Sequence, residues 1–362
     1  MLSTLTGRQA YEGKYVGAAG IDCDHDGENM VEVALPSPRR NGSAPPYHLH
    51  FSDEIGHSRV SWERIVKKQP AVFHTGKFGF VGAGPVAIAL ANALSQRGYV
   101  VSMISSRTGV SAARLASRFS GTTAVKRPQE VADNCATVFL TVPDDSIESI
   151  ASATRWRPGQ AVLHCSGVTT LDALEVPHSQ GAFVGGFHPM QSFLGSDPSD
   201  GSLCGITFGL EADPPLREWL EGVVENIGGR YIHLSGSARA LYHASAVTAC
   251  GLVATLLHLS VELWKEFADS TTARQALLPL VGKTLENFQN EGLSGALTGP
   301  LMRGDVGTIE KHIGALKEAR SELLPIYCHL ALAALPIARK KPGQIPRERW
   351  EALESALRKG IQ

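Results

Sequence analysis

Residues 77–107 read KFGFVGAGPVAIALANALSQRGYVVSMISSR, and this stretch decides the fold. Its pattern predicts a short apolar strand over Lys77–Val81, a helix over Val86–Arg97 and a second strand over Tyr99–Ile104. A G-x-G-x-x-A turn, Gly82–Ala87, joins the first strand to the helix. Its glycines permit a tight turn and a close approach of the backbone to a pyrophosphate, and its alanine lets the helix pack close to the strand. The unit therefore predicts a dinucleotide site at the start of the helix.

The 362-residue chain divides into three parts, and this unit lies near the start of the middle one. From about 74 to 235, apolar β-branched runs alternate with helical stretches, which predicts βαβ units in a doubly wound sheet. Residues 238–362 are helical in pattern, and residues 1–73 form an appended N-terminal segment of uncertain fold. The fold class is therefore α/β, a doubly wound Rossmann-type domain followed by an all-helical domain. The helices expected in the second domain are 239–268, about 273–290, about 306–333 and one from Pro346.

Composition narrows the class of protein. Basic and acidic side chains number 34 and 35, so no nucleic-acid partner is expected, and 43% hydrophobic residues indicate a globular chain. The six cysteines form no CxxC pair, which argues against a zinc site. The N-terminus has no apolar run behind a basic start, so we expect a cytoplasmic protein. Polar residues interrupt the most apolar stretch, Leu241–Leu263, and we expect a buried helix there and no membrane partner.

The residues after the second strand favour NADP as the cofactor. An NAD site usually has a carboxylate about 20 residues past the glycines, for the ribose 2′-hydroxyl. This chain has two serines and an arginine there, which suit a 2′-phosphate, although Arg107 as a simple solvated loop residue is the alternative. The expected cofactor-binding residues are Gly82, Ala83, Gly84, Pro85, Val86, Ser105, Ser106, Arg107, Val142, Pro143 and Ser166.

Two further strand ends should face the nicotinamide. The strands predicted at Thr137–Val142 and Ala161–His164 run into PDD and CSG, and ligands of doubly wound sheets lie outside the carboxyl ends of the strands. The next loop carries His188 between apolar neighbours. A histidine can donate a proton near neutral pH, so His188 is the best candidate for a proton donor.

The order of five motifs resembles a known family. TVPDD, HCSG, FHPMQSF, LYHASAV and ALTGPLMRGD follow one another as in the Rossmann-like oxidoreductases that carry a helical C-terminal domain of unknown function, domain family 2520. These are distant relatives of the 6-phosphogluconate dehydrogenase superfamily, which includes ketopantoate reductase, pyrroline-5-carboxylate reductase and prephenate dehydrogenase. The HPM motif is similar to that of prephenate dehydrogenases. This similarity implies that His188 acts on the substrate oxygen and that Ser166 supports it.

The chain departs from the family pattern at the start of the long helix. The family has a lysine three residues before Tyr-His, where this chain has Arg239, and Gly251 replaces an amide side chain. An arginine can bind an anion but cannot give up its proton, so acid–base chemistry at this position is in doubt. Further candidates are His243 and Arg239 for catalysis, and Gln191, Arg239 and Arg303 for binding the substrate.

These observations predict a homodimeric, NADP-dependent oxidoreductase. It would transfer a hydride between NADPH and a small carbonyl or imine substrate, which the two arginines suggest is anionic. The homodimer is expected because a helix that is apolar nearly all round needs burial on every side. The alternatives are a catalytically inactive NADP-binding sensor or scaffold, and a protein whose N-terminal segment binds a partner.

Overall fold

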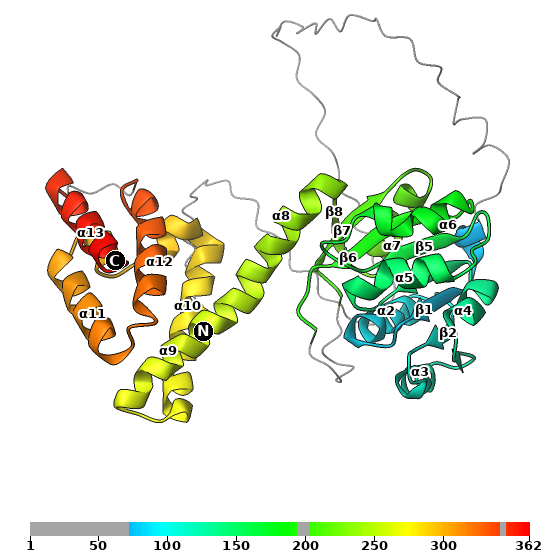
Figure 1. Cartoon of the computed structure of the whole chain (residues 1–362), viewed down its shortest axis with the longest axis horizontal. Coiled ribbons are helices and arrows are strands. Elements are labelled where there is room, and N and C mark those ends of the chain that lie inside the picture. Colours follow the sequence, from blue (N-terminus) through cyan, green and yellow to red (C-terminus); the bar gives the residue numbers. More distant parts are fainter. Residues whose placement is uncertain (1–71, 194–202, 341–344) are drawn as a thin grey trace, which may run out of the picture. The chain divides into compact units, whose positions relative to one another are not determined.

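The computed structural model describes residues 72–193, 203–340 and 345–362 of the chain (Figure 1). All but the last two residues of the predicted appended segment lie outside this part. The chain divides into two compact units, Met1–Ala240 and Leu241–Gln362. The division falls inside helix α8 (Gly236–Val247), a few residues after the boundary predicted between residues 235 and 238.

The first unit is built on an eight-stranded sheet with strand order β3-β2-β1-β4-β5-β6-β7-β8. Neighbouring strands are parallel except β6 and β7, which are antiparallel. The strand order reverses between β1 and β4, as it does at the ligand-binding edge of doubly wound folds. The strands are β1 Phe78–Val81, β2 Val101–Ser105, β3 Thr123–Val125, β4 Thr137–Leu140, β5 Ala161–His164, β6 Phe183–Pro189, β7 Thr207–Ala212 and β8 Arg230–His233.

Helices cover both faces of this sheet (Figure 1). Side chains of α2, α3 and α7 join one buried cluster around Phe80, and side chains of α4 and α5 join a second around Val138. Every residue of β1, β4 and β5 is buried, as expected for strands with a helix layer on each face. The predicted doubly wound domain is confirmed. Its helices are α2 Pro85–Gln96, α3 Val110–Ala116, α4 Pro128–Asn134, α5 Asp144–Ala153, α6 Glu175–Ser179 and α7 Leu216–Asn226.

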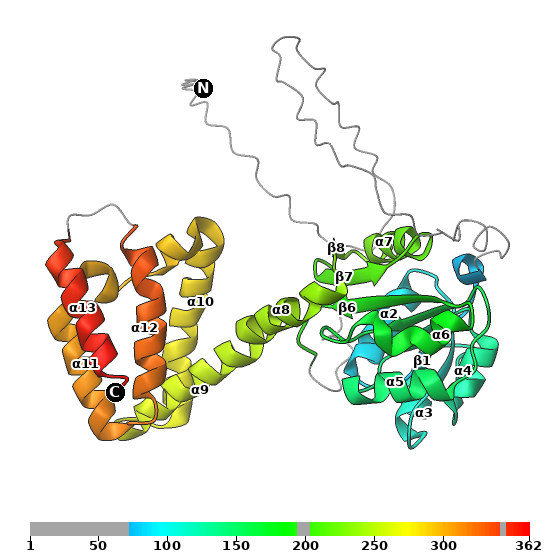
Figure 2. The same ribbon diagram turned by 45° about the horizontal axis from the view of Figure 1, so that its top comes forward.

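The second unit is helical, as predicted, and its core lies among its last three helices (Figure 2). This core contains Ile309, Cys328 and Leu353, one from each of α11, α12 and α13. A turn of π-helix, Thr248–Leu252, lies between α8 and α9. The helices after it are α9 Val253–Leu263, α10 Ser270–Ala296, α11 Val306–Ala319, α12 Leu324–Ala338 and α13 Arg347–Lys359.

One expectation for the helical region was wrong. The single helix expected over 306–333 is two helices, because Pro325 lacks an N–H group and its ring would clash with the carbonyl four residues earlier. The burial expected for the long apolar helix is not supplied by this chain alone, since α9 has no buried residue, and the second copy expected to cover it stays a prediction. Among the described residues one helical stretch, Gly236–Glu266, is long and apolar enough to cross a membrane by length and composition. Core helices of soluble proteins pass the same test, so this is weak evidence for a span.

Candidate functional site

The glycine turn has the geometry that its sequence predicts. Gly82 has φ +105°, and a Cβ at this position would overlap the carbonyl of Thr141 on the neighbouring strand end. The Gly82 N–H donates to the carbonyl of Ser105 at 2.9 Å. The Thr141 hydroxyl donates to the carbonyls of Val81 and Gly82 at 3.2 and 3.0 Å. Only glycine fits this point, where the ends of β1, β2 and β4 meet.

The start of α2 is shaped to receive an anion. Gly84 is the N-cap, and a Cβ built on it would have no atom within 4 Å, so the space beside its backbone is open. Pro85 occupies the first helical turn without the loss of a needed N–H, and no described side chain caps the helix. Ala87 is fully buried against the sheet. The free N–H groups and the helix dipole favour a phosphate here.

The residues after β2 differ in accessibility. Ser105 is 1% exposed, so its hydroxyl is turned into the fold. The hydroxyl of Ser106 accepts the N–H of Ala112 at 3.1 Å and shapes the loop. Arg107 is exposed, and the adjoining Thr108–Gly109 turn contains no carboxylate. Of the three predicted 2′-phosphate ligands, Arg107 is the one with an exposed side chain that can reach a cofactor phosphate.

The ends of β4 and β5 lie at the same edge of the sheet, since the two strands are parallel and adjacent. Val142 and Pro143 lead from β4 directly into α5. After β5, the Ser166 hydroxyl accepts the N–H groups of Val168 and Thr169 at 3.2 and 3.0 Å. Ser166 thereby holds its own loop in shape and keeps its hydroxyl proton for another acceptor.

His188 lies within β6 opposite Gly209 of β7, and it is half-buried. His164, at the end of β5, pairs in register with Gly186 on β6. Burial, together with the positive charges of Arg239 and His188, lowers the pKa of His164 to about 3. His164 is therefore neutral at physiological pH.

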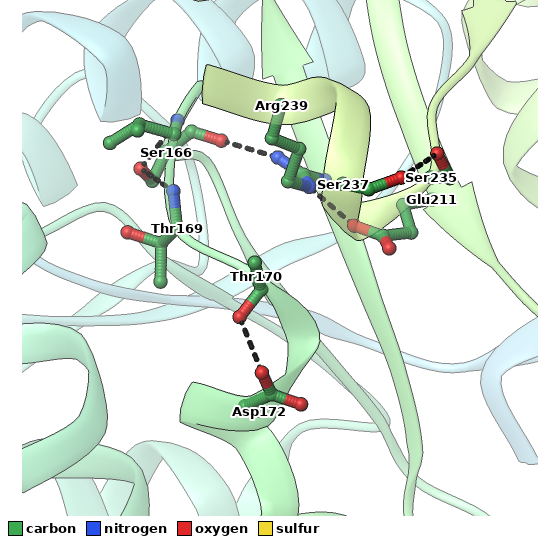
Figure 3. A network of polar contacts seen from close by, with 9 residues as sticks. Ser166, Thr169, Thr170, Asp172, Glu211, Ser235, Ser237 and Arg239 are labelled. Carbon is green, nitrogen blue, oxygen red and sulfur yellow. Dashed lines mark hydrogen bonds and ion pairs between the residues drawn. The ribbon is translucent and has the colours of Figure 1, made fainter. Parts of the chain in front are cut away.

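Arg239 has a different environment from the one its sequence position suggested (Figure 3). Its side chain is fully buried in the first unit, where its Nε donates to the Glu211 carboxylate and its Nη1 donates to the carbonyl of Ser166 at 3.0 Å. The Glu211 carboxylate offsets the guanidinium charge. The expectation of an anionic substrate therefore depends on Arg303 more than on Arg239.

The remaining candidates occupy other settings. Gln191 is exposed after β6, and its side-chain oxygen accepts the N–H of Ser192 at 3.0 Å. His243 and Arg303 belong to the second unit, where His243 is half-buried and Arg303 is exposed. In the loop after Arg303, Asp305 caps α11 by accepting the N–H of Thr308 at 3.1 Å.

Sequence reasoning missed two members of the site, Glu211 and His164. Glu211 is a carboxylate in an otherwise apolar strand, TFGLEA, and this was an available signal for a buried partner. His164 ends an apolar strand and reads as a core residue. No group of three or more His, Cys, Asp or Glu side chains within the described ranges could hold a metal.

Comparisons with known proteins agree with this fold. Residues 68–189 match the family model of a Rossmann-like domain, and residues 206–334 match that of a domain of unknown function, DUF2520. The chain thus contains a Rossmann-like domain and a DUF2520 domain, and the predicted resemblance is confirmed. A search of curated proteins finds no match.

Solved structures show the same fold at low identity. A "putative NADP oxidoreductase" from Bacteroides fragilis is 23% identical with a TM-score of 0.59, and the match covers 72% of this chain and 98% of that one. A protein from Thermotoga maritima is also 23% identical, with a TM-score of 0.57 and the same coverage. An imine reductase from Aspergillus terreus, solved with NADPH4 and dibenz[c,e]azepine, is 17% identical with a TM-score of 0.50, covering 78% and 99%.

Proposed function

We propose that the chain is an NADP-dependent oxidoreductase that transfers a hydride between NADPH and the carbon of a small carbonyl or imine. The observation that carries this proposal is the strand–turn–helix unit, whose Gly84 N-cap is open and whose next strand ends at an exposed Arg107 without a carboxylate. Two fold relatives described as an NADP oxidoreductase and an imine reductase are in keeping with this chemistry.

The residues at this edge of the sheet fit a dinucleotide. The N–H groups in the first turn of α2 would bind its pyrophosphate, and a Cβ at Gly84 would intrude on the open space beside them. Arg107 would bind the 2′-phosphate through charge-assisted hydrogen bonds. Val142, Pro143 and Ser166, at the next two strand ends, would line the nicotinamide end. When bound, NADPH supplies the hydride.

His188 is the proposed proton donor to the substrate. As hydride arrives at the carbon of a C=O or C=N bond, the π electrons move to the oxygen or nitrogen, and that atom takes a proton from the His188 imidazolium. The products are an alcohol or an amine and neutral His188, which solvent reprotonates. We also propose that the substrate is anionic.

We also propose that the protein is a homodimer joined through its helical unit, and that it works in the cytoplasm. Large apolar side chains on α10 are exposed, among them Leu280 at 64% and Leu285 at 59%. Exposed apolar surface of this kind marks an interaction site, and a second copy of the chain would supply an equally apolar face.

Cofactor affinity tests the proposed function. NADPH should bind at least tenfold more tightly than NADH, because the 2′-phosphate contact contributes more than about 1.4 kcal/mol. Arg107→Asp should abolish or reverse this preference, whereas Arg118→Asp, an exposed change elsewhere in the same unit, should leave it intact. Isothermal titration calorimetry gives both dissociation constants. Equal affinities of the unaltered protein for the two cofactors would refute the NADP assignment.

One alternative function has a specific observation in its favour. Arg239 is buried and ion-paired where the family has a lysine, so this chain lacks that proton-transfer group and could be a sensor that binds NADPH without turnover. NADPH binding combined with no NADPH oxidation in the presence of keto acids or cyclic imines would favour the sensor.

A further inference from the structure

Arg239 connects three elements of the first unit that are distant in sequence. It lies in the first turn of α8, its Nε contacts Glu211 on β7, and its Nη1 donates to the carbonyl of Ser166 after β5 at 3.0 Å (Figure 3). One planar guanidinium can make both contacts at once, because its N–H groups point in fixed, divergent directions. A lysine ammonium could bind the carboxylate but would lack this fork.

The backbone of β6 is shaped to this guanidinium. A Cβ on Gly186 would overlap Nη2 of Arg239 and would lie 2.8 Å from its Cζ and 3.2 Å from Cε1 of His164. The guanidinium and the His164 ring therefore both lie close to the backbone of Gly186. His188, the proposed proton donor, is two residues further along the same strand.

The polar atoms near Gly186 are buried to an unusual degree. Arg239 and His164 are both 0% exposed, and Nη2 of Arg239 and both ring nitrogens of His164 have no hydrogen-bond partner among the described residues. A buried cation is costly unless it is paired, and Glu211 supplies the opposite charge. A hydrophobic side chain would fill the same space without this cost, so the pair is better explained by a role in geometry than by stability.

We propose that Arg239 and Glu211 are positioning residues, which hold the Ser166 loop against β6 beside His188, and that Arg239 does not bind the substrate. This inference rests on the proposed function for its catalytic meaning. The Ser166 loop adjoins β6 through the β5–β6 pairing, and its shape depends on the two N–H groups that its hydroxyl accepts. The bond from Arg239 to the Ser166 carbonyl fixes the serine backbone as well, so the Ser166 hydroxyl proton keeps a single direction.

Hydrogen exchange measures the positioning directly. In Arg239→Lys the ion pair with Glu211 is kept, but the bond to the Ser166 carbonyl is lost. We expect the amides of Val168 and Thr169 to exchange about tenfold faster, the equivalent of one hydrogen bond of about 1.4 kcal/mol, while those of β1 exchange as before. Arg339→Met, which removes the 3.0 Å ion pair of Arg339 with Glu354 in the second unit, is the matched control and should leave both regions unchanged.

A second variant keeps every charged side chain of the protein. Gly186→Ala puts a methyl group where Nη2 lies, so it should displace the guanidinium and reproduce the loop exchange of Arg239→Lys. If Arg239→Lys folds poorly, this variant decides the matter in its place. Unchanged exchange at Val168 and Thr169 in the folded variants would overturn the proposal.

Kinetics separate positioning from substrate binding. With pyruvate as an anionic probe and 2-methyl-1-pyrroline as a probe without a carboxylate, Arg239→Lys should lower kcat by about tenfold for whichever is reduced, with KM within about threefold. A tenfold rise in KM for pyruvate alone, with kcat unchanged, would instead show that Arg239 binds the anion. Exchange decides the question if neither probe is reduced. If the unaltered protein does not bind NADPH, the proposed function fails, but the structural role of the pair is still measured by exchange.

Discussion

The sheet of the first unit and the helix pair α9–α10 of the second are both rich in apolar residues, yet the two regions bury these residues to very different extents. Every residue of β1, β4 and β5 is buried. In contrast, α9 has no buried residue and α10 has only Ala273. An apolar sequence therefore says that a segment needs a partner, but not whether the partner lies in the same chain.

The difference follows from how each region is covered. A βαβ unit brings its own helix onto the strand that precedes it, so the sheet is enclosed by segments close in sequence. In the second unit α11, α12 and α13 bury their apolar faces against one another. The side chains of α9 and α10 do not join that core. They line a hollow between the two helices, whose apolar walls are Leu257, Val261, Leu277 and Leu278.

The largest expected effect contrasts a core phenylalanine with an exposed one. Phe80 is 0% exposed and stacks on Phe139 at 5.2 Å between ring centroids, so Phe80→Ala should lower the free energy of unfolding of the first unit by about 3–5 kcal/mol. Phe288 on α10 is 54% exposed, and Phe288→Ala should change the stability of the monomer by less than about 0.5 kcal/mol. Urea unfolding at dilutions that keep the protein monomeric measures both. Equal losses would show that α10 is packed within the chain after all.

The second effect locates the chemistry in the sheet region. His188→Ala should lower kcat by roughly 10² to 10⁴, the usual contribution of a positioned general acid, with NADPH affinity nearly unchanged. His188→Gln should recover part of the loss if hydrogen bonding matters more than proton transfer. Steady-state kinetics and calorimetry give the two quantities.

A histidine of the helical unit provides the control for that experiment. His312 is exposed and its Nδ1 lies 2.9 Å from the Tyr327 hydroxyl in the α11–α12 pair, so His312→Ala should leave kcat unchanged. Full activity of the His188→Ala variant would remove this histidine from the mechanism and make Ser166 and His243 the next candidates.

The smallest effect concerns assembly and bears on the exposed helices alone. Leu285→Lys places a charge on the exposed face of α10 and should weaken the homodimer by about tenfold or more, since it would bury an unpaired cation. Light scattering over a range of micromolar concentrations measures the change. Arg347→Leu, on the outer surface of α13, is a matched control that should not alter it. An unaltered protein that is monomeric at these concentrations would contradict the homodimer.

The sequence predicted the first unit well because its signals are local. The G-x-G-x-x-A turn fixes a strand, a turn and a helix within a few residues, and α2 begins one residue earlier than expected and ends one residue earlier. The NADP preference is likewise a local inference from Arg107, and it stays a prediction. The break between α11 and α12 also had a local signal in Pro325, which the apolar pattern of the segment outweighed.

Contacts between distant residues left no such signal. Arg239 and Glu211 are 28 positions apart. A carboxylate in an apolar strand indicates that Glu211 has a partner, but nothing in the sequence identifies that partner as Arg239. Arg239 therefore read as a free cation that could bind an anion. The apolar character of α9 predicted that this helix needs cover, but periodicity does not identify the segment or the partner that supplies it.

Gly82 sets a limit on how this protein can be re-engineered. Its positive φ and the carbonyl that would overlap a Cβ rule out every other amino acid, so the turn cannot be retuned one residue at a time. Arg107, in the exposed loop after β2, carries no such constraint, whereas Gly109 in the same loop has φ +76° and also favours glycine. A laboratory that wished to convert the protein from one nicotinamide coenzyme to the other would search for variants in that loop and hold the glycine turn fixed.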